Sequence, residues 1–348
     1  MTIALDAMGG DLGPRAVIPG AARALSADPH LRFLLFGREA DITSALASYP
    51  ALRAVSQTLH TDQVVASDDK PATALRQGRE SSMRKAIDAV ADGRASCVVS
   101  SGNTGALMAM AKIVLKTLPG IHRPAIASVF PTMKNPAIML DLGANIECDP
   151  EMLVQFAVLG AVYARAIRNV DQPTVGLLNV GSEDVKGHDE LRRAAAILGA
   201  VDFPGIYHGF IEGNDIPLGT TDVVVTDGFT GNVALKVAEG VAKMTDGYVR
   251  QAFRSSFWAM LGGLLAAPAL KNLKKRVDPR LYNGGMFLGI NGICVKSHGG
   301  SDDVAFANAV GVAASLVRNN FNDHVAQEID RVMNQESFVS PLVADAGA

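Results

Sequence analysis

The stretch CVVSSGNTGALMAMAKIVLK, residues 97–116, decides the fold class. It opens with a short apolar run, turns through a loop that contains glycine, and continues with an apolar segment long enough for a helix. In α/β proteins, buried strands joined to helices in this way form a mainly parallel sheet that is covered on both faces. The stretch therefore predicts one βα unit of such a sheet.

Further segments of the chain repeat this order of strand, polar loop and helix. They begin with residues 3–7, 137–145, 174–183, 222–232 and 292–301. Neither a linker rich in Pro, Ser or Gly nor a tandem repeat divides the chain. The sequence therefore predicts a single α/β domain at residues 1–335, with a helical excursion at about 240–285 and a flexible tail at 336–348.

The composition of the 348 residues is that of a globular protein with little net charge. The formal net charge of −3 gives no general reason to bind nucleic acid. Cys97, Cys148 and Cys294 lie far apart without a C-x-x-C pair, which is typical of a reducing compartment and argues against a structural zinc. The first residues, MTIALDAMGGD, lack the basic flank and long apolar run of a signal peptide. A cytoplasmic protein is expected.

Four loops between strands and helices have the composition of anion sites. They are MGGDLGP (8–14), SGNTGA (101–106), GSEDVKGHD (181–189) and DGFTGN (227–232). Backbone N–H groups at such helix starts can hold a phosphate, although the same residue types also occur in ordinary tight turns and N-caps. Ligands of these sheets bind beyond the carboxyl ends of the strands. We therefore expect the loops to converge on one sheet edge and to bind an anion.

Several charged residues near these strand ends have two interpretations. Lys186 is either a solvated lysine or a cation that clamps an anion, and His298 is either structural or a donor to the same ligand. Asp6, Asp141 and Asp227 each end a strand. They could bind a metal, cap helices or order the loops, but a divalent ion requires clustered carboxylates. The structural role is therefore favoured over a metal site.

Motifs for a covalent nucleophile or a dinucleotide are missing from the sequence. The chain lacks a G-x-S-x-G elbow, a Walker A loop, and a G-x-G-x-x-G after its first strand. The sequence thus indicates anion binding without a covalent intermediate.

A set of motifs resembles those of the bacterial phosphate acyltransferase family, the acyl-[acyl-carrier-protein]:phosphate enzymes of phospholipid synthesis. In chain order they are DAMGGD (6–11), SGNTGA (101–106), LDLGAN (140–145), LLNVGSEDVKG (177–187), TDGFTGN (226–232) and VKSHGGSD (295–302). The resemblance runs from about residue 2 to about residue 330. It implies an isocitrate-dehydrogenase-like or phosphate-acetyltransferase-like three-layer α/β/α fold, a homodimer, no metal or organic cofactor, and peripheral attachment to a membrane.

The same resemblance implies transfer of a fatty acyl group from the thioester of acyl carrier protein to inorganic phosphate. The product, acyl phosphate, would pass to a downstream glycerol-3-phosphate acyltransferase. Phosphate is already an anionic nucleophile and a thiolate leaves easily, so no catalytic triad is needed. Lys186 and Asn232 are expected to be catalytic. The residues expected to bind phosphate or the thioester are Asp6, Gly9, Gly10, Asn103, Thr104, Gly105, Asp141, Asn145, Asp227, Thr230 and His298.

The stretch SSFWAMLGGLLAAPALKNLKKR (255–276) is first apolar and then basic. Such a segment suits a helical element that dips into acyl chains and meets anionic headgroups, or that receives an acidic carrier protein. Burial in a dimer interface or in the core is the alternative. Pro268 is expected to end the first helix of this stretch. The residues expected to contact the membrane or the carrier protein are Phe257, Trp258, Leu261, Lys271, Lys274 and Lys275.

Three other functions compete with this interpretation. Transfer from acyl-coenzyme A, as in phosphate acetyltransferases, would need a nucleotide pocket and no dock for a carrier protein. A metal-dependent decarboxylating dehydrogenase of related fold would need clustered carboxylates. A non-catalytic membrane scaffold for lipid-synthesis enzymes would not need so many polar loop motifs.

Overall fold

The computed structural model describes residues 1–276 and 278–338, and within these ranges the strands form one 11-stranded sheet. The strands are β1 (Thr2–Asp6), β2 (Arg32–Gly37), β3 (Ser56–His60), β4 (Cys97–Ser100), β5 (Ala125–Phe130), β6 (Ala137–Leu140), β7 (Thr174–Leu178), β8 (Ile206–Ile211), β9 (Val223–Val225), β10 (Gly285–Leu288) and β11 (Ile293–Lys296). All six predicted strands are present in this sheet.

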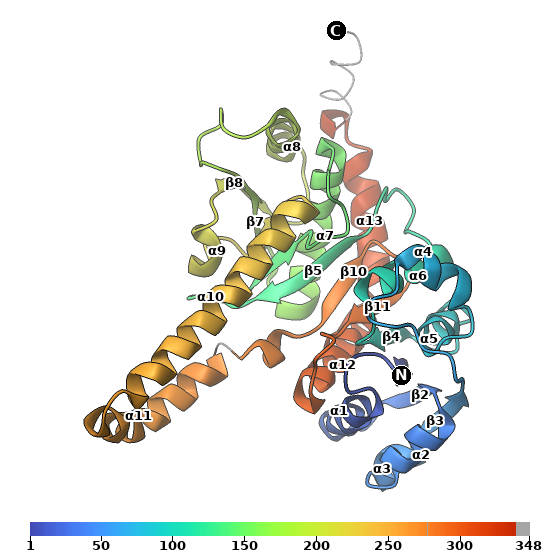
Figure 1. Cartoon of the computed structure of the whole chain (residues 1–348). Coiled ribbons are helices and arrows are strands. Elements are labelled where there is room, and N and C mark those ends of the chain that lie inside the picture. Colours follow the sequence, from blue (N-terminus) through green and yellow to red (C-terminus); the bar gives the residue numbers. More distant parts are fainter. Residues whose placement is uncertain (277, 339–348) are drawn as a thin grey trace.

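Helices follow most of these strands (Figure 1). They are α1 (Pro14–Ala27), α2 (Glu39–Leu46), α3 (Pro50–Ala54), α4 (Pro71–Gln77), α5 (Ser82–Ala91), α6 (Thr104–Leu115), α7 (Pro150–Arg168), α8 (Asp189–Ala200), α9 (Asp215–Leu218), α10 (Gly228–Arg254), α11 (Phe257–Arg276), the 3-10 helix η1 (Pro279–Tyr282), α12 (Asp303–Arg318) and α13 (Phe321–Met333).

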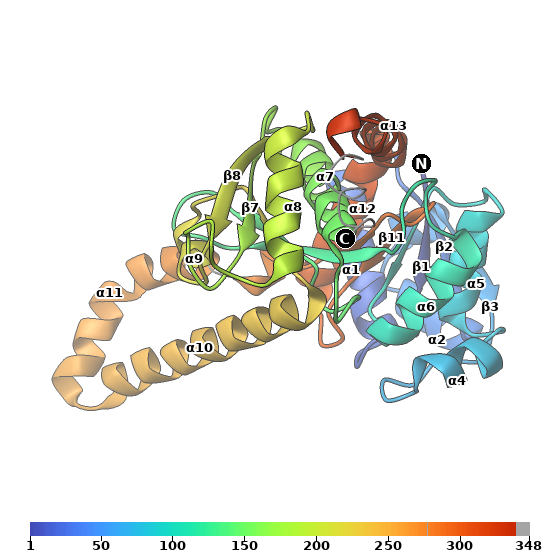
Figure 2. The same cartoon turned by 90° about the horizontal axis from the view of Figure 1, so that it is seen from above.

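The first strand shows how the helices cover both faces of the sheet. Successive side chains of a strand point to opposite faces. Ile3 and Leu5 of β1 accordingly belong to a core cluster that includes Val17 of α1 and Phe306 of α12. Ala4, between them, belongs to a second cluster with side chains of α5 and α6. This is the three-layer arrangement that the sequence predicted, and Figure 2 shows it from above.

The sheet contains two parallel runs that point in opposite directions. Its strand order is β3-β2-β1-β4-β11-β10-β5-β6-β9-β7-β8. The strands from β3 to β11 are parallel to one another, and so are those from β6 to β8. Between them, β10 is antiparallel to β11 and to β5, and β5 is antiparallel to β6. The carboxyl ends of the two runs therefore lie at opposite edges of the sheet.

This reversal corrects the prediction that all the glycine-rich loops converge on one edge. We call the end of β1, β4 and β11 the first edge, with loops 7–13, 101–103 and 297–302. The end of β6, β9 and β7 is the second edge, with loops 141–149, 226–227 and 179–188. Three strand spacings of about 4.8 Å and a strand length of about 13 Å separate the ends of β11 and β6 by roughly 20 Å.

The predicted helical excursion is a two-helix hairpin that projects from the domain in Figures 1 and 2. It is formed by α10 and α11, so its helical part begins at residue 228 rather than at about 240. Phe257, Trp258 and Leu261 are exposed near the turn, which does not agree with burial in the core of the chain. Lys271 is exposed as well. Lys274 and Lys275 lie in α11, but their side chains are outside the described residues.

The prediction that Pro268 ends a helix was wrong. The helix α11 runs through Pro268, from Phe257 to Arg276. Proline removes one backbone hydrogen bond from a helix and usually breaks or kinks it. Here the deprived carbonyl belongs to Leu264, whose side chain is 71% exposed, so water can replace the missing donor.

The contact between α10 and the end of β6 generates a prediction about stability. A Cβ atom at Gly231 would lie 1.9 Å from the backbone oxygen of Asp141, whereas one at Gly240 of the same helix would meet nothing within 4 Å. We expect Gly231→Ala to destabilise the fold by about 2–4 kcal/mol, and Gly240→Ala to be neutral or stabilising by up to about 1 kcal/mol. Urea unfolding of both variants measures the difference, and equal stabilities would contradict the close approach of these two elements.

Candidate active site

The loops of the first edge pack backbone against backbone because glycine occupies the points of contact. A Cβ atom at Gly9 would lie 2.8 Å from the nitrogen of Gly102, and one at Gly10 would lie 2.7 Å from the oxygen of Gly299. The N–H of Asp11 donates to that same Gly299 oxygen at 2.9 Å. The loops after β1, β4 and β11 are thereby joined into one surface.

The buried side chain of Asp6 holds these loops in place through hydrogen bonds. Its carboxylate is 1% exposed, and its two oxygens accept hydrogen bonds from the Ser82 hydroxyl at 2.6 Å and the Ser100 hydroxyl at 2.7 Å. Burial raises the pKa of Asp6, while the two hydroxyls act in the opposite direction. Because both oxygens already have partners, Asp6 orders the loops rather than facing a ligand, which is the structural role favoured from the sequence.

Lys296, which the sequence analysis missed, ends β11 at the first edge. Its ammonium donates to the backbone oxygens of Ser101, at 3.3 Å, and Ser297. Burial lowers the pKa of Lys296 to about 8, although the charges of Asp6 and Asp11 raise it. The sequence did contain a signal, because this lysine ends an apolar strand and precedes a glycine loop.

The start of α6 and the loop after β11 present donors beside Lys296. Asn103 caps α6 by accepting from the Ala106 N–H at 3.0 Å, so its side chain has a structural role. Thr104 and Gly105 are exposed, and their N–H groups donate no hydrogen bond within residues 1–276 and 278–338. In exposed His298, Nδ1 accepts from the Gly300 N–H at 3.1 Å. In the neutral ring the proton is then on Nε2, which can donate.

At the second edge, Asp141 is the buried carboxylate that orders the loops, as Asp6 is at the first edge. It is fully buried and accepts hydrogen bonds from the N–H groups of Ile126, Ala144 and Asn145 at 2.9, 3.1 and 2.7 Å. The side chain of Asn145 also donates to it at 2.9 Å and to the Pro124 oxygen at 2.9 Å. Burial raises the pKa of Asp141, and these donors lower it. Asp141 and Asn145 therefore hold the loop that precedes α7.

The predicted catalytic residues follow two neighbouring strands at the second edge, Lys186 in a loop and Asn232 in the first part of α10. Asp227 caps α10 by accepting from the N–H of Thr230 at 2.8 Å and from its hydroxyl at 2.7 Å. Asn232 is exposed one turn further along α10, and a Cβ at Gly143 would lie 3.7 Å from its Cγ. Lys186 is exposed in the loop after β7, the strand next to β9.

The structure thus divides the predicted site residues into two groups. Asp6, Gly9, Gly10, Asn103, Thr104, Gly105 and His298 are at the first edge, and Asp141, Asn145, Lys186, Asp227, Thr230 and Asn232 are at the second. Within the described residues, no group of three His, Cys, Asp or Glu side chains is placed to hold a metal ion.

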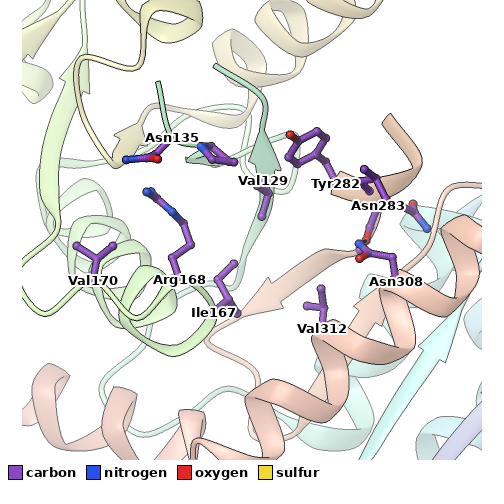
Figure 3. A pocket seen from close by; sticks show the side chains of 12 residues that line it. Val129, Asn135, Ile167, Arg168, Val170, Tyr282, Asn283, Asn308 and Val312 are labelled. Atoms are coloured by element: carbon purple, nitrogen blue, oxygen red, sulfur yellow. Dashed lines mark hydrogen bonds between the residues drawn. The ribbon is translucent and has the colours of Figure 1, made fainter. Parts of the chain in front are cut away.

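A cavity of about 450 Å³ opens next to the first edge. Asn283 connects the two, because it lines the cavity and its Oδ1 accepts from the His298 N–H at 2.9 Å. In Figure 3 the Arg168 side chain points toward Asn135, while Asn283 and Asn308 lie on the other side. Arg168 is paired with Asp222 at 3.1 Å. The apolar part of the cavity lining comes from Val129, Pro136, Ile167, Val170, Leu281 and Val312.

Comparison with known proteins places the chain in a family. Residues 1–324 match the fatty acid synthesis protein family. A phosphate acyltransferase of Rhodospirillum centenum is 56% identical over 348 residues, covering 99% of this chain and 98% of the relative. Another, of Paramagnetospirillum magneticum, is 53% identical over 344 residues, with 99% and 98% covered. The chain belongs to the phosphate acyltransferase family. Membership of the phosphate acyltransferase family makes it an acyltransferase, as its motifs predicted.

Solved structures confirm the expected fold. A phosphotransacetylase from Streptococcus pyogenes has a TM-score of 0.60 at 18% identity, covering 91% of this chain and 94% of that one. The EutD phosphotransacetylase from Staphylococcus aureus has a TM-score of 0.59 at 16% identity, with the same coverage. At these identities the likeness concerns the fold alone.

Among the described helices, α7 is long and apolar enough to cross a membrane, but 78% of its apolar window is buried inside the protein. It packs against β9, β6 and β7. We therefore interpret α7 as the central core helix of the second half of the sheet.

Proposed function

We propose that the protein transfers a fatty acyl group from acyl carrier protein to inorganic phosphate, which yields acyl phosphate for phospholipid synthesis. The relatives named phosphate acyltransferase support the acceptor. The observation that carries the proposal for the site is the pair Lys186 and Asn232. Lys186 lies in the loop after β7 and Asn232 lies at the start of the helix after the adjacent strand β9, at one sheet edge, and both are exposed, so a substrate can reach them.

The reaction joins a phosphate oxygen to the thioester carbonyl and releases the carrier's thiolate. Phosphate supplies its own negative oxygen near neutral pH. In our proposal Lys186 holds the phosphate and offsets the developing charge, and Asn232 donates to the phosphate or to the carbonyl oxygen. Loss of one such donor typically slows an acyl transfer by about a hundredfold to a thousandfold. The N–H groups of Thr104 and Gly105 and the His298 ring are further donors for phosphate or thioester.

Replacement of Lys186 tests this assignment. We expect Lys186→Ala to reduce acyl phosphate formation from palmitoyl-carrier protein at least about a hundredfold, because the charge on phosphate loses its partner. The exposed lysine variant Lys134→Ala is the matched control and should keep full activity. Thiol release and acyl phosphate are measured together, and unchanged melting temperatures exclude a folding effect. Wild-type turnover in Lys186→Ala would refute the assignment.

The acyl donor and the enzymatic role are tested on the unmodified protein. Turnover with palmitoyl-carrier protein should exceed turnover with palmitoyl-coenzyme A. The reverse preference would favour the acetyltransferase-like alternative. Absence of thiol release with either donor would favour a non-catalytic scaffold for lipid-synthesis enzymes.

We also propose that the hairpin attaches this cytoplasmic enzyme to an anionic membrane surface. Its apolar tip supports this, because Phe257 and Trp258 are 69% and 76% exposed and stack edge to face at 5.7 Å. Basic residues follow in the sequence at Lys271, Lys274 and Lys275. Apolar side chains beside lysines fit both acyl chains and anionic headgroups. The same lysines could also contact an acidic carrier protein. Attachment of the enzyme to the membrane would bring its product, acyl phosphate, to a glycerol-3-phosphate acyltransferase.

Charged residues at the tip should abolish attachment without affecting chemistry. We expect the double variant Trp258→Asp, Leu261→Asp to lose at least about tenfold in binding to anionic vesicles, because charges in the acyl region are costly. Its activity with soluble substrates should be unchanged. A control double variant outside the hairpin, Ile206→Asp in β8 with Ile113→Asp in α6, changes two other exposed apolar side chains and should still bind. Vesicle flotation measures the difference, and undiminished binding of the tip variant would contradict the proposal.

A homodimer is the third part of the proposed function. An apolar stripe of Val233, Val237, Val241, Met244 and Tyr248 follows α10 at helical spacing, and each side chain is 47–63% exposed. The stripe begins beside Asn232, so a partner seated on α10 would lie next to the second edge. Since the two edges of one chain are roughly 20 Å apart, we propose that the first edge of one protomer completes the second edge of its partner.

Mixed dimers test this arrangement. Lys186→Ala and His298→Ala change opposite edges, and each should be strongly impaired alone. Random mixing should restore roughly one quarter of wild-type activity, because half of the dimers are mixed and one site in each of these is intact. Differently tagged chains allow mixed dimers to be counted. Recovery no greater than the sum of the two pure variants, with mixed dimers present, would exclude a shared site.

A further inference from the structure

Lys296 is a partly buried cation without a carboxylate in contact. Its ammonium bonds only to backbone oxygens, those of Ser101 and Ser297, among the described residues. No carboxylate of residues 1–276 and 278–338 lies within 4.0 Å of it in an ion pair. Of the two carboxylates whose charges act on Lys296, Asp6 and Asp11, Asp6 is occupied by Ser82 and Ser100. A lysine in this position is costly unless an anion joins it.

The loops that flank Lys296 carry hydrogen-bond donors of the kind that a phosphate group accepts. The exposed N–H groups of Thr104 and Gly105 and the Nε2–H of His298 are donors on the loops that flank the lysine. Glycines at positions 9, 10 and 102 allow the three loops to approach one another as backbone alone. A compact dianion with several acceptor oxygens uses such donors fully, whereas a carboxylate has only two oxygens to offer.

We propose that Lys296 binds a phosphate group of a substrate at the first edge, in contact with the loops that follow β1, β4 and β11. The inference rests on the proposed acyl transfer and adds a binding residue to it. Two substrates of the proposed reaction contain a phosphate group. One is inorganic phosphate, and the other is the acyl carrier protein, whose thiol-bearing arm is attached through a phosphodiester.

Direct binding and kinetics with matched variants test the assignment. Full-length wild type, Lys296→Met, Lys296→Arg and the control Lys112→Met are titrated with inorganic phosphate by calorimetry. The KM values for phosphate and for palmitoyl-carrier protein are measured for the same set. Lys112 is an exposed lysine on α6, so its variant removes the same charge from the neighbouring surface. Melting temperatures report any structural effect.

We expect Lys296→Met to weaken binding roughly ten- to hundredfold, the usual worth of a hydrogen bond to a charged group. A change in the Kd and KM of inorganic phosphate assigns the site to the acceptor. A change confined to the KM of the carrier protein assigns it to the arm's phosphodiester. Lys296→Arg keeps the charge and should retain most of the binding. If all of these constants in Lys296→Met stay within about twofold of Lys112→Met, the proposal is wrong.

A second measurement, the pH dependence of wild-type affinity, tests the proposal even if Lys296→Met does not fold. The charges that face Lys296 are Asp6 from β1, Asp11 from the next loop and, when protonated, His298 from its own loop. Binding requires the ammonium, and the pKa of Lys296 in the free protein is lowered to about 8. Wild-type affinity for the phosphate group should therefore fall about tenfold per pH unit above 8, where phosphate itself is already a dianion.

The same pH profile in Lys296→Arg should be flat to about pH 10, because arginine stays charged. A wild-type affinity that does not change between pH 7.5 and 9.5 would overturn the proposal. Failure of the proposed function has a different signature, since wild type would then release no thiol from any acyl donor. Phosphate titration does not depend on turnover, so the two outcomes are distinguishable.

Discussion

Three successive antiparallel pairings in the middle of the sheet, β11 with β10, β10 with β5 and β5 with β6, are the constraint on which the rest of the structure depends. Because the number of reversals is odd, every strand beyond β5 runs against the strands of the first half. Each half is parallel within itself and collects its own loops at its own edge. The same glycine-rich design therefore appears twice in one chain, at two places that cannot share a small ligand within one protomer.

Each edge depends on one buried carboxylate. Asp6 and Asp141 are removed from water, which raises the pKa of both. Hydroxyl donors offset this cost at the first edge, and mainly backbone N–H donors offset it at the second. These bonds fix the loops, so that the groups facing solvent, such as His298 and Asn232, are held on a rigid base. Preorganised donors of this kind need little rearrangement when charge develops in a substrate.

Local pattern predicted the elements of the fold well, but not their pairing. The strands before glycine loops were recognisable because an apolar run and a helix start are adjacent in sequence. The strands at 56–60, 125–130, 206–211 and 285–288 were not predicted, and neither was the strand at 32–37, although its apolar run ends in a glycine just before α2. Strand direction depends on contacts between distant segments, so the three antiparallel pairings between β11 and β6 could not be predicted. Lys296 was overlooked although it ends an apolar strand before a glycine loop, because only its burial shows that its charge is unusual. Pro268 was expected to end a helix, but the exposed backbone at Leu264 tolerates the lost hydrogen bond.

The unbroken length of α10 has a geometric consequence. Its 27 residues span about 40 Å at 1.5 Å per residue, and they begin at the loop of Asn232 and end at the apolar tip. The apolar tip and the second edge are consequently held roughly 40 Å apart, at the two ends of one helix. The length of α10 therefore sets the distance between the groups that the second edge presents and anything that contacts the tip.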